Sequence, residues 1–379
     1  MRRAAALALG VALLASGCGG KAARSAAEIA PADVRSFMSV PPEQEQPLTR
    51  RALAFTPGGQ RVQALLERAA WSRAAGERVE VAELRDGRLV AYALLKNTKG
   101  LDAAQLAHVR VRGWIAFAPT KAALTAARSK RHLSDAHWYT AAADAAGGSG
   151  TTFVAPGWVA IATEGGTVRR TTPGRGRDGP HPLARDIPPD AVAAAASHSG
   201  ARLLRSLPVE RMIGLRPDIL AQATPGSAVL YVRGGAPLPN VTLLALDGSV
   251  AAARRVTAEL APGMQLALRE TVNGLALWHV ALGAVDLYYG RVGHTLVLTD
   301  DADVSLGGSQ LEPPDLPAAT SAWFYVDVPR ARSALGMLAR FGGASSVARS
   351  FDRKYAGLDS ALFYTTHDQG RETHTIVLH

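Results

Sequence analysis

The stretch RVEVAELRDGRLVAYALL (Arg78–Leu95) decides the fold class, because it has the pattern of two strands joined by a tight turn. Its two halves, 78–84 and 88–95, are rich in branched and aliphatic residues, and the Arg-Asp-Gly between them is typical of a hairpin turn. Strands joined by so short a connection pair antiparallel. The sequence therefore predicts antiparallel sheet at this point of the chain.

Other apolar runs have the length and composition of strands. They cover residues 34–40, 113–119, 227–234, 240–247, 275–282, 285–292, 294–300, 321–328, 360–368 and 372–379. Helical patterns lie between them at 59–76, 249–260 and 329–341. Hairpins mixed with single helices predict an α+β fold of mainly antiparallel sheet, with helices covering one face.

Weak internal repeats favour two related lobes. A proline and a small residue lead into a strand at Pro31, Pro225 and Pro317, each time with an aromatic residue six positions after the proline. GWIAFAPT (Gly113–Thr120) also resembles GHTLVLTD (Gly293–Asp300), because both run from glycine through an apolar strand to a polar residue able to cap a helix. Repetition at strand starts is what a duplicated unit produces.

The break between the lobes is predicted in TVRRTTPGRGRDGPHPLARDIPPD (Thr167–Asp190). Proline and glycine are dense there and apolar periodicity is absent, which predicts a linker or a long surface loop. Its arginines could contact phosphate groups, but a solvated basic linker explains them without a ligand. The predicted N-terminal lobe is then 31–166, and the predicted C-terminal lobe is 191–379.

Residues 1–17 have the three parts of an export signal. Arg2 and Arg3 supply the positive start, residues 4–14 are apolar, and residues 15–17 (Ala-Ser-Gly) are the small residues that a signal peptidase requires. The apolar run is about a dozen residues long, whereas a membrane-spanning helix needs about 20. We therefore expect an exported protein rather than one with a membrane-spanning start.

Cys18 is the single cysteine of the chain and directly follows the signal. Small residues ending in Gly-Cys resemble the bacterial lipobox, although the large aliphatic Leu14 lies one position earlier than usual. The motif implies that Cys18 is acylated and becomes the N-terminus, on the outer face of the cytoplasmic membrane. A plain secreted protein and a retained anchor are the alternatives. Residues 18–30 are predicted to be a short tether of small residues.

The charge of the chain is strongly positive. It carries 42 Lys and Arg against 32 Asp and Glu, a net charge of +10, with arginine far more frequent than lysine. A GC-rich genome explains this composition without a function. The functional alternative is attraction to anionic headgroups or wall polymers, at about 1 kcal/mol for each basic residue near such a surface. The export signal argues against nucleic acid, and no recognition motif points to it.

Longer stretches carry a family resemblance. They are PADVRSFMSV (31–40), GWIAFAPTKAALTAARSKRHLSDAHWYTAA (113–142) and PNVTLLALD (239–247). With them the chain resembles an actinobacterial family of lipid-anchored or secreted proteins, whose domain of unknown function has Leu-Pro-Ala-Asp-type strand starts. The family's Leu-Ser/Ala-Asp segment, with an aromatic residue three positions on, matches the stretch from Leu133 to Trp138. The resemblance implies an envelope protein and assigns no catalytic residue.

Local motifs for catalysis are absent from the sequence. It has no Gly-x-Ser-x-Gly, His-Glu-x-x-His, Ser-x-x-Lys or Gly-Lys-Ser/Thr pattern, so no cofactor is predicted. The ten histidines are scattered, and a zinc site would need residues brought together from distant parts of the chain. His279, His374 and His379 fall in predicted strands, where we expect packed or edge-strand side chains.

One stretch, DADVSLGGSQLE (Asp301–Glu312), partly matches a calcium loop. Its candidate ligands are Asp301, Asp303, Ser305 and Glu312. Leu306 occupies the place of the essential turn glycine. Capping of a helix after the preceding strand explains the acidic residues without a metal ion.

Two functional classes remain open at this point. The first is a membrane-anchored, non-catalytic binding or scaffold protein, with an anionic envelope polymer, a hydrophobic ligand or another envelope protein as partner. The second is an envelope hydrolase or transferase whose site is assembled from distant residues. The absence of a local catalytic signature favours the first.

Overall fold

The chain forms two units that divide between Pro173 and Gly174. We call them the N-terminal unit and the C-terminal unit. The computed structural model describes residues 23–41, 56–69, 78–147, 150–157, 159–164, 166–206, 217–235, 238–260, 268–282, 285–308, 310–340, 345–355 and 357–379. The signal peptide, Cys18 and the first part of the predicted tether lie outside the described residues.

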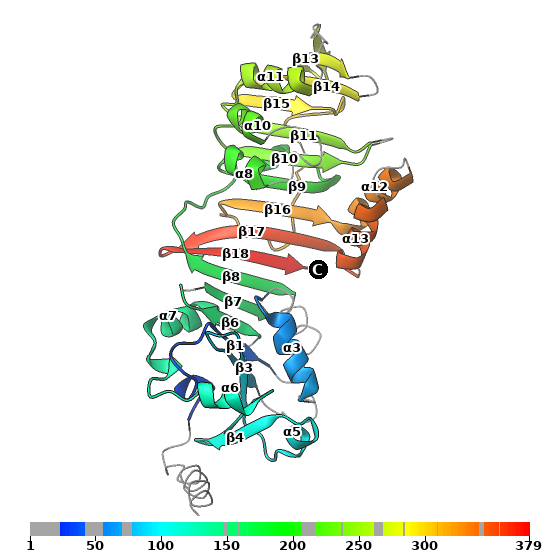
Figure 1. Ribbon diagram of the computed structural model, residues 1–379. Coiled ribbons are helices and arrows are strands. Elements are labelled where there is room, and N and C mark those ends of the chain that lie inside the picture. The colour runs from blue at the N-terminus through cyan, green and yellow to red at the C-terminus, as the bar shows by residue number, and fades with distance from the viewer. Residues whose placement is uncertain are drawn as a thin grey trace, which may run out of the picture. The chain divides into compact units, whose positions relative to one another are not determined.

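The described strands of the N-terminal unit form one antiparallel sheet (Figure 1). Their order across the sheet is β4–β5–β3–β2–β1–β6–β7–β8. The bounds are β1 Ser36–Val40, β2 Val79–Glu83, β3 Leu89–Ala93, β4 Ala107–Val111, β5 Trp114–Ala118, β6 Thr152–Ala155, β7 Val159–Glu164 and β8 Thr167–Pro173. The hairpin predicted for 78–95 is confirmed as β2 and β3, which pair antiparallel.

Helices cover both faces of this sheet. They are α3 Gly59–Arg68, α5 Lys99–Ala103, α6 Lys121–Ala126 and α7 His137–Ala146, with short 3-10 turns η1 Ala26–Glu28 and η3 Leu133–Asp135. Phe37 of β1 meets Tyr139 of α7 edge-on at 5.6 Å on one face, whereas the next residue, Met38, lines a hollow beneath α3 on the other. The prediction of helices on one face only is therefore wrong for this unit, because successive β1 side chains are buried on opposite sides.

The C-terminal unit is built on a second antiparallel sheet. Its described strands follow the order β12–β13–β14–β15–β11–β10–β9–β16–β17–β18. The bounds are β9 Ala191–Ser197, β10 Ala228–Arg233, β11 Asn240–Leu246, β12 Leu268–Val272, β13 Leu275–Leu282, β14 Val285–Val292, β15 Thr295–Thr299, β16 Ala322–Asp327, β17 Ser360–Asp368 and β18 Arg371–Leu378.

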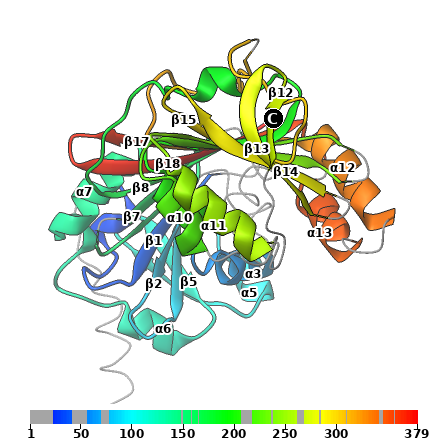
Figure 2. The ribbon, with the colours of Figure 1, turned by 90° about the horizontal axis from the view of Figure 1, so that it is seen from above.

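The two faces of this sheet are covered differently. One face packs against helices, of which α10 and α11 lie side by side in Figure 2. These helices are α8 Gly200–Ser206, α10 Pro217–Ala223, α11 Val250–Leu260, α12 Val328–Arg340 and α13 Ser345–Tyr355. The other face is covered by irregular chain, in which Leu183, Ile187 and Val304 pack on Tyr231 and Trp323. The one short turn of 3-10 helix in that layer is η4, Ala184–Asp186.

Tight turns with two left-handed residues set the register of several hairpins. Asn273-Gly274 joins β12 to β13 with φ of 47° and 81°, and Gln369-Gly370 joins β17 to β18 with φ of 46° and 78°. Two consecutive positive φ values define the turn whose twist matches paired strands, and glycine adopts such values without steric cost. Mainly antiparallel sheet with helices, as the sequence predicts, is confirmed.

The predicted linker or long surface loop at 167–190 is wrong for its first seven residues, which form a strand. Residues 167–173 pair as β8 with β7, and four of them (Thr167, Val168, Thr171 and Thr172) are β-branched, as is common in strands. Residues 174–190 are irregular chain apart from η4. Beyond Gly174 the chain packs on the C-terminal unit, with Leu183 and Ile187 only 2% and 0% exposed. Apolar side chains spaced four residues apart within a polar segment hold it on the sheet.

Candidate functional site

The leader, which we define as residues 23–30, is docked on the N-terminal unit instead of extending from it. Ala26, Ala27 and Ala30 are at most 1% exposed and belong to the core formed by the sheet, α6 and α7. Their methyl groups allow the backbone to lie close against neighbouring strands. The prediction of a tether over 18–30 is therefore wrong from Ala23 onward.

Main-chain and side-chain hydrogen bonds fix the start of the leader. The Ala23 N–H donates to the Arg112 carbonyl at 3.0 Å, and Trp114 Nε1 donates to the Ala23 carbonyl, also at 3.0 Å. Trp114 is 4% exposed, so its indole N–H would lack a partner if the leader left the surface. The leader thus completes the hydrogen bonding of the β4–β5 hairpin.

Glu80 holds the middle of the leader from within the sheet. Its Oε2 accepts the Ala26 N–H at 2.7 Å. Burial raises the pKa of the Glu80 carboxyl above its ordinary value, against the opposing effects of the Ala26 N–H and of Arg78. Tyr139 of α7 is affected by the negative charge of this carboxylate. Burial, together with the charge of Glu80, raises the pKa of Tyr139 to about 12. A buried carboxylate is therefore committed to one backbone donor of the leader.

Two further contacts secure the end of the leader. Arg112 Nη1 donates to the Glu28 carbonyl at 3.1 Å, and its guanidinium lies 3.5 Å from the Glu28 carboxylate. The Leu133 N–H donates to the Ala30 carbonyl at 2.9 Å.

Only residues 19–22 separate Cys18 from Ala23. Five residue steps span at most about 17 Å, so little free chain remains between the two.

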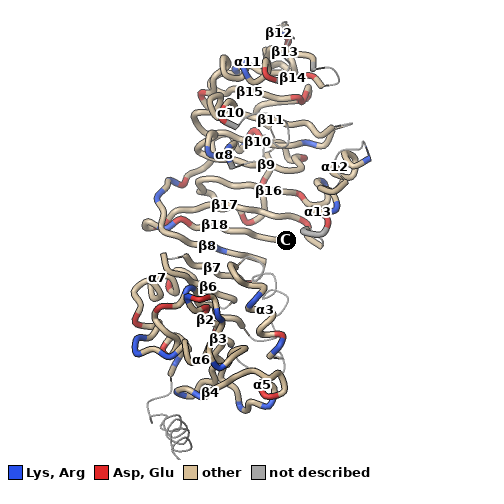
Figure 3. Tube along the Cα trace, viewed as in Figure 1, with Lys and Arg blue, Asp and Glu red and all other residues tan. Residues whose placement is uncertain are grey.

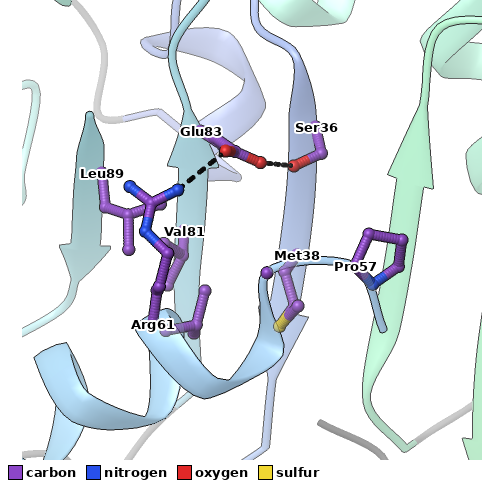
Figure 4. A pocket seen from close by; sticks show the side chains of 9 residues that line it. Ser36, Met38, Pro57, Arg61, Val81, Glu83 and Leu89 are labelled. Atoms are coloured by element: carbon purple, nitrogen blue, oxygen red, sulfur yellow. Dashed lines mark hydrogen bonds and ion pairs between the residues drawn. The ribbon is translucent and has the colours of Figure 1, made fainter. Parts of the chain in front are cut away.

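A small hollow lies beneath α3 (Figure 4). Arg61 of α3 lies 3.2 Å from Glu83 of β2, and Glu83 also accepts the Ser36 hydroxyl at 3.1 Å. The hollow has room for about one water molecule. Its polar groups satisfy one another, so it offers neither space nor free donors to a small-molecule ligand.

The C-terminal unit brings together a histidine and an aspartate that lie far apart in sequence. His367 of β17 donates its backbone N–H to Asp178 at 2.6 Å, and its ring Nδ1 lies 3.0 Å from the same carboxylate. The ring Nε2 is buried and has no hydrogen-bond partner among the described residues. The segment after Gly174 covers this ring, since a Cβ added to Gly176 would lie 2.1 Å from Nε2. The pair fastens that segment to the sheet.

A second contact of the same segment involves two imidazole rings that pack at a tilt of 31°. The ring centroids of His181 and His198 are 5.2 Å apart, and His198 Nε2 lies 3.3 Å from the Gly179 carbonyl. Burial lowers the pKa of His181 to about 4. The ring is neutral at pH 7, and its Nδ1 accepts the Leu183 N–H at 3.4 Å. Within the described residues, no group of His, Cys, Asp and Glu side chains has the arrangement needed to hold a metal ion.

Of the four candidate calcium ligands, Asp301 pairs with an arginine. Arg233 Nη1 lies 2.9 Å from Asp301 Oδ2, and Asp301 is 1% exposed, so a guanidinium occupies the place of the cation. Asp301 Oδ1 accepts the Asp303 N–H at 2.9 Å. Within the described part of the chain, Glu312 belongs to no group of His, Cys, Asp and Glu side chains that could hold a metal ion. The predicted helix capping is wrong here, because the described residues 301–308 and 310–321 contain no helix.

The three strand histidines lie in polar contacts at strand surfaces. His279 stacks on Tyr288 and lies 2.9 Å from Glu270 and 2.8 Å from Asp286, one carboxylate at each ring nitrogen. The hydrogen bond to Asp286, followed by that to Glu270, raises the pKa of His279. The other two have one acidic neighbour each, Glu372 for His374 and Asp315 for His379.

No helix among the described residues has both the length and the apolar character to cross a bilayer.

No known protein family and no curated protein matches the chain. Two solved structures of TP0453 were found. Crystal form I has a TM-score of 0.21 at 10% identity and covers 75% of this chain and 96% of that one. Crystal form III has a TM-score of 0.19 at 8% identity, with 73% and 94% covered. Scores this low support no inference about fold or function.

Exchanging Glu80 tests how the leader is held. Glu80→Gln keeps an acceptor for the Ala26 N–H and removes a buried charge, so we expect unchanged or higher stability at pH 7. Glu80→Ala removes the acceptor, and the Ala26 amide should exchange with solvent about tenfold faster. The exposed Glu67→Ala on α3 is the control. Equal exchange of Ala26 in all three variants would show that Glu80 does not hold the leader.

The depressed pKa of His181 predicts acid sensitivity of the C-terminal unit. The unfolded chain binds a proton near pH 6.5 and the folded chain near pH 4, so stability is full above pH 6.5 and falls as the pH is lowered towards 4. The loss should approach about 3 kcal/mol, measured by urea unfolding at a series of pH values. His181→Phe should flatten this window, whereas exposed His294→Phe should not. A slope that survives His181→Phe contradicts the assignment.

Proposed function

We propose that the protein is a lipid-anchored, non-catalytic binding or scaffold protein on the outer face of the cytoplasmic membrane. Its anchor is a diacylated Cys18, exposed by cleavage after Gly17. The observation that carries this proposal is the docked leader, because a chain built into the fold from Ala23 suits an attachment point at Cys18.

Non-catalytic action is supported by how the polar groups of the described residues are used. The Arg61–Glu83 pair fills the hollow beneath α3, and Arg233 neutralises Asp301. In these sites the charged groups satisfy each other instead of leaving a nucleophile, an acid and a base facing open space. We therefore favour binding of an envelope component over turnover of one.

We also infer that the two units are related copies. The order β4–β5–β3–β2–β1–β6–β7–β8 corresponds strand by strand to β14–β15–β11–β10–β9–β16–β17–β18. In this correspondence GWIAFAPT contributes β5 and GHTLVLTD contributes β15, so the two similar stretches occupy equivalent places. The β12–β13 hairpin and the helices between β16 and β17 are then additions to the second copy. The proline-led repeats do not follow the correspondence, since β1 is equivalent to β9.

The second candidate is an envelope hydrolase or transferase with a site assembled from distant residues. The Asp178–His367 pair favours it, because a carboxylate that orients an imidazole is the usual support of a general base. The ring is 8% exposed, and its Nε2 is covered by the Gly176 backbone. A base must reach its substrate, so this candidate requires the segment after Gly174 to leave the sheet.

Acylation of Cys18 is tested by labelling cells with palmitate. We expect the parent chain to take up label and to stay in the membrane fraction after a high-salt wash. Cys18→Ala should take up none, because no other thiol exists in the chain. Gly20→Ala is the control and should label like the parent. An unlabelled parent chain, or a labelled Cys18→Ala variant, would show that the lipobox assignment is wrong.

A further inference from the structure

The net positive charge of the chain belongs to its N-terminal part. Residues 174–379 contain 19 Lys and Arg against 19 Asp and Glu and are neutral overall, whereas residues 18–173 contain 21 against 13. A compositional bias of the genome acts on the whole chain and leaves this difference unexplained. A surface that attracts anions explains why the excess lies in the unit that carries the leader.

Exposed basic side chains flank both ends of the docked leader. Arg24 follows Ala23 directly, and Arg128, Lys130 and Arg131 lie between α6 and η3, in the blue stretch between α6 and α7 in Figure 3. The Arg131 carbonyl accepts the Ala32 N–H at 3.0 Å, which fixes this stretch beside the end of the leader. We call these four residues the basic surface. None of them forms an ion pair with a described residue.

We propose that the basic surface contacts the anionic phospholipid headgroups of the bilayer in which the protein is anchored. The proposal rests on the acylation of Cys18. A tether of residues 19–22 keeps Ala23 within about 17 Å of the acylated cysteine. Attraction to anionic headgroups acts over roughly 8 to 10 Å at physiological salt, so the anchor brings Arg24, the neighbour of Ala23, close to the range in which that attraction operates.

Charge and anchor position together favour a lipid surface over a soluble anion. Three of the uncompensated charges lie on one exposed stretch, residues 128–131, and the fourth lies at the start of the leader. Separate exposed charges of this kind suit a surface with many phosphates. Each basic residue near such a surface strengthens binding about fivefold. The surface would orient the anchored protein, with the stretch 128–131 towards the bilayer.

The test uses vesicles and the chain 19–379, which contains every described residue but no acylated cysteine. It should bind vesicles of mixed phosphatidylglycerol and phosphatidylcholine, and bind pure phosphatidylcholine far more weakly. The triple variant R128Q/K130Q/R131Q should lose about a hundredfold in affinity for the mixed vesicles. The matched control, R254Q/R255Q/R269Q, neutralises three exposed arginines of the C-terminal unit and should change affinity little.

Several results would overturn the proposal. Equal binding to both vesicle compositions would remove the role of headgroup charge, and equal losses in the two triple variants would place the contact elsewhere. Binding of soluble polyglutamate at residues 128–131 without vesicle binding would identify a wall polymer as the partner instead. Because this chain carries no lipid, a failure here leaves the palmitate result untouched, and a failure of acylation leaves the vesicle result untouched.

Discussion

Two hydrogen bonds fix where the chain joins the N-terminal unit. Trp114 Nε1 donates to the Ala23 carbonyl, and the Ala26 N–H donates to Glu80. The Trp114 indole is buried and the Glu80 carboxylate is half-buried, so leaving either of them unpaired would cost free energy. Alanines of the leader fill the space between the strands and α7. Because the leader is part of the core, the fold sets where the chain before Ala23 joins the N-terminal unit.

The C-terminal unit uses buried polar pairs for the same structural purpose. Asp178 with His367 and Asp301 with Arg233 each fasten irregular chain to a strand. Removing one partner of such a pair leaves the other buried and unpaired, which lowers the stability of the folded chain. The pairs therefore hold the irregular chain firmly on the strand. They also explain why scattered histidines and acidic residues in the sequence need not indicate chemistry. The C-terminal unit has no net charge, which agrees with the use of its charged side chains in pairs within the fold.

The sequence predicts the hairpins well, because turns such as Asn273-Gly274 and alternation in the flanking strands are local signals. Prediction from the sequence fails where one amino-acid composition is compatible with two different structures. AVAAAAS has the composition of a helix, yet it forms β9 between β10 and β16, where small side chains let helices pack closely. The alanines of the leader resemble a flexible tether for the same reason. Glu80 has the pattern of an outward-facing strand residue, and only the folded chain reveals the backbone donor opposite it.

The distance between the N-terminal unit and the bilayer tests the central claim most directly. A dye on Ser129→Cys, in the acylated protein, would transfer energy to acceptor lipids in high salt, where headgroup attraction is screened. If the tether ends at Ala23, energy transfer from the dye to the acceptor lipids should be strong. A flexible insertion of about 20 Gly and Ser residues after Gly19 should weaken this energy transfer, since such a chain spans roughly 25 Å. Equal transfer with and without the insertion would contradict a leader built into the fold.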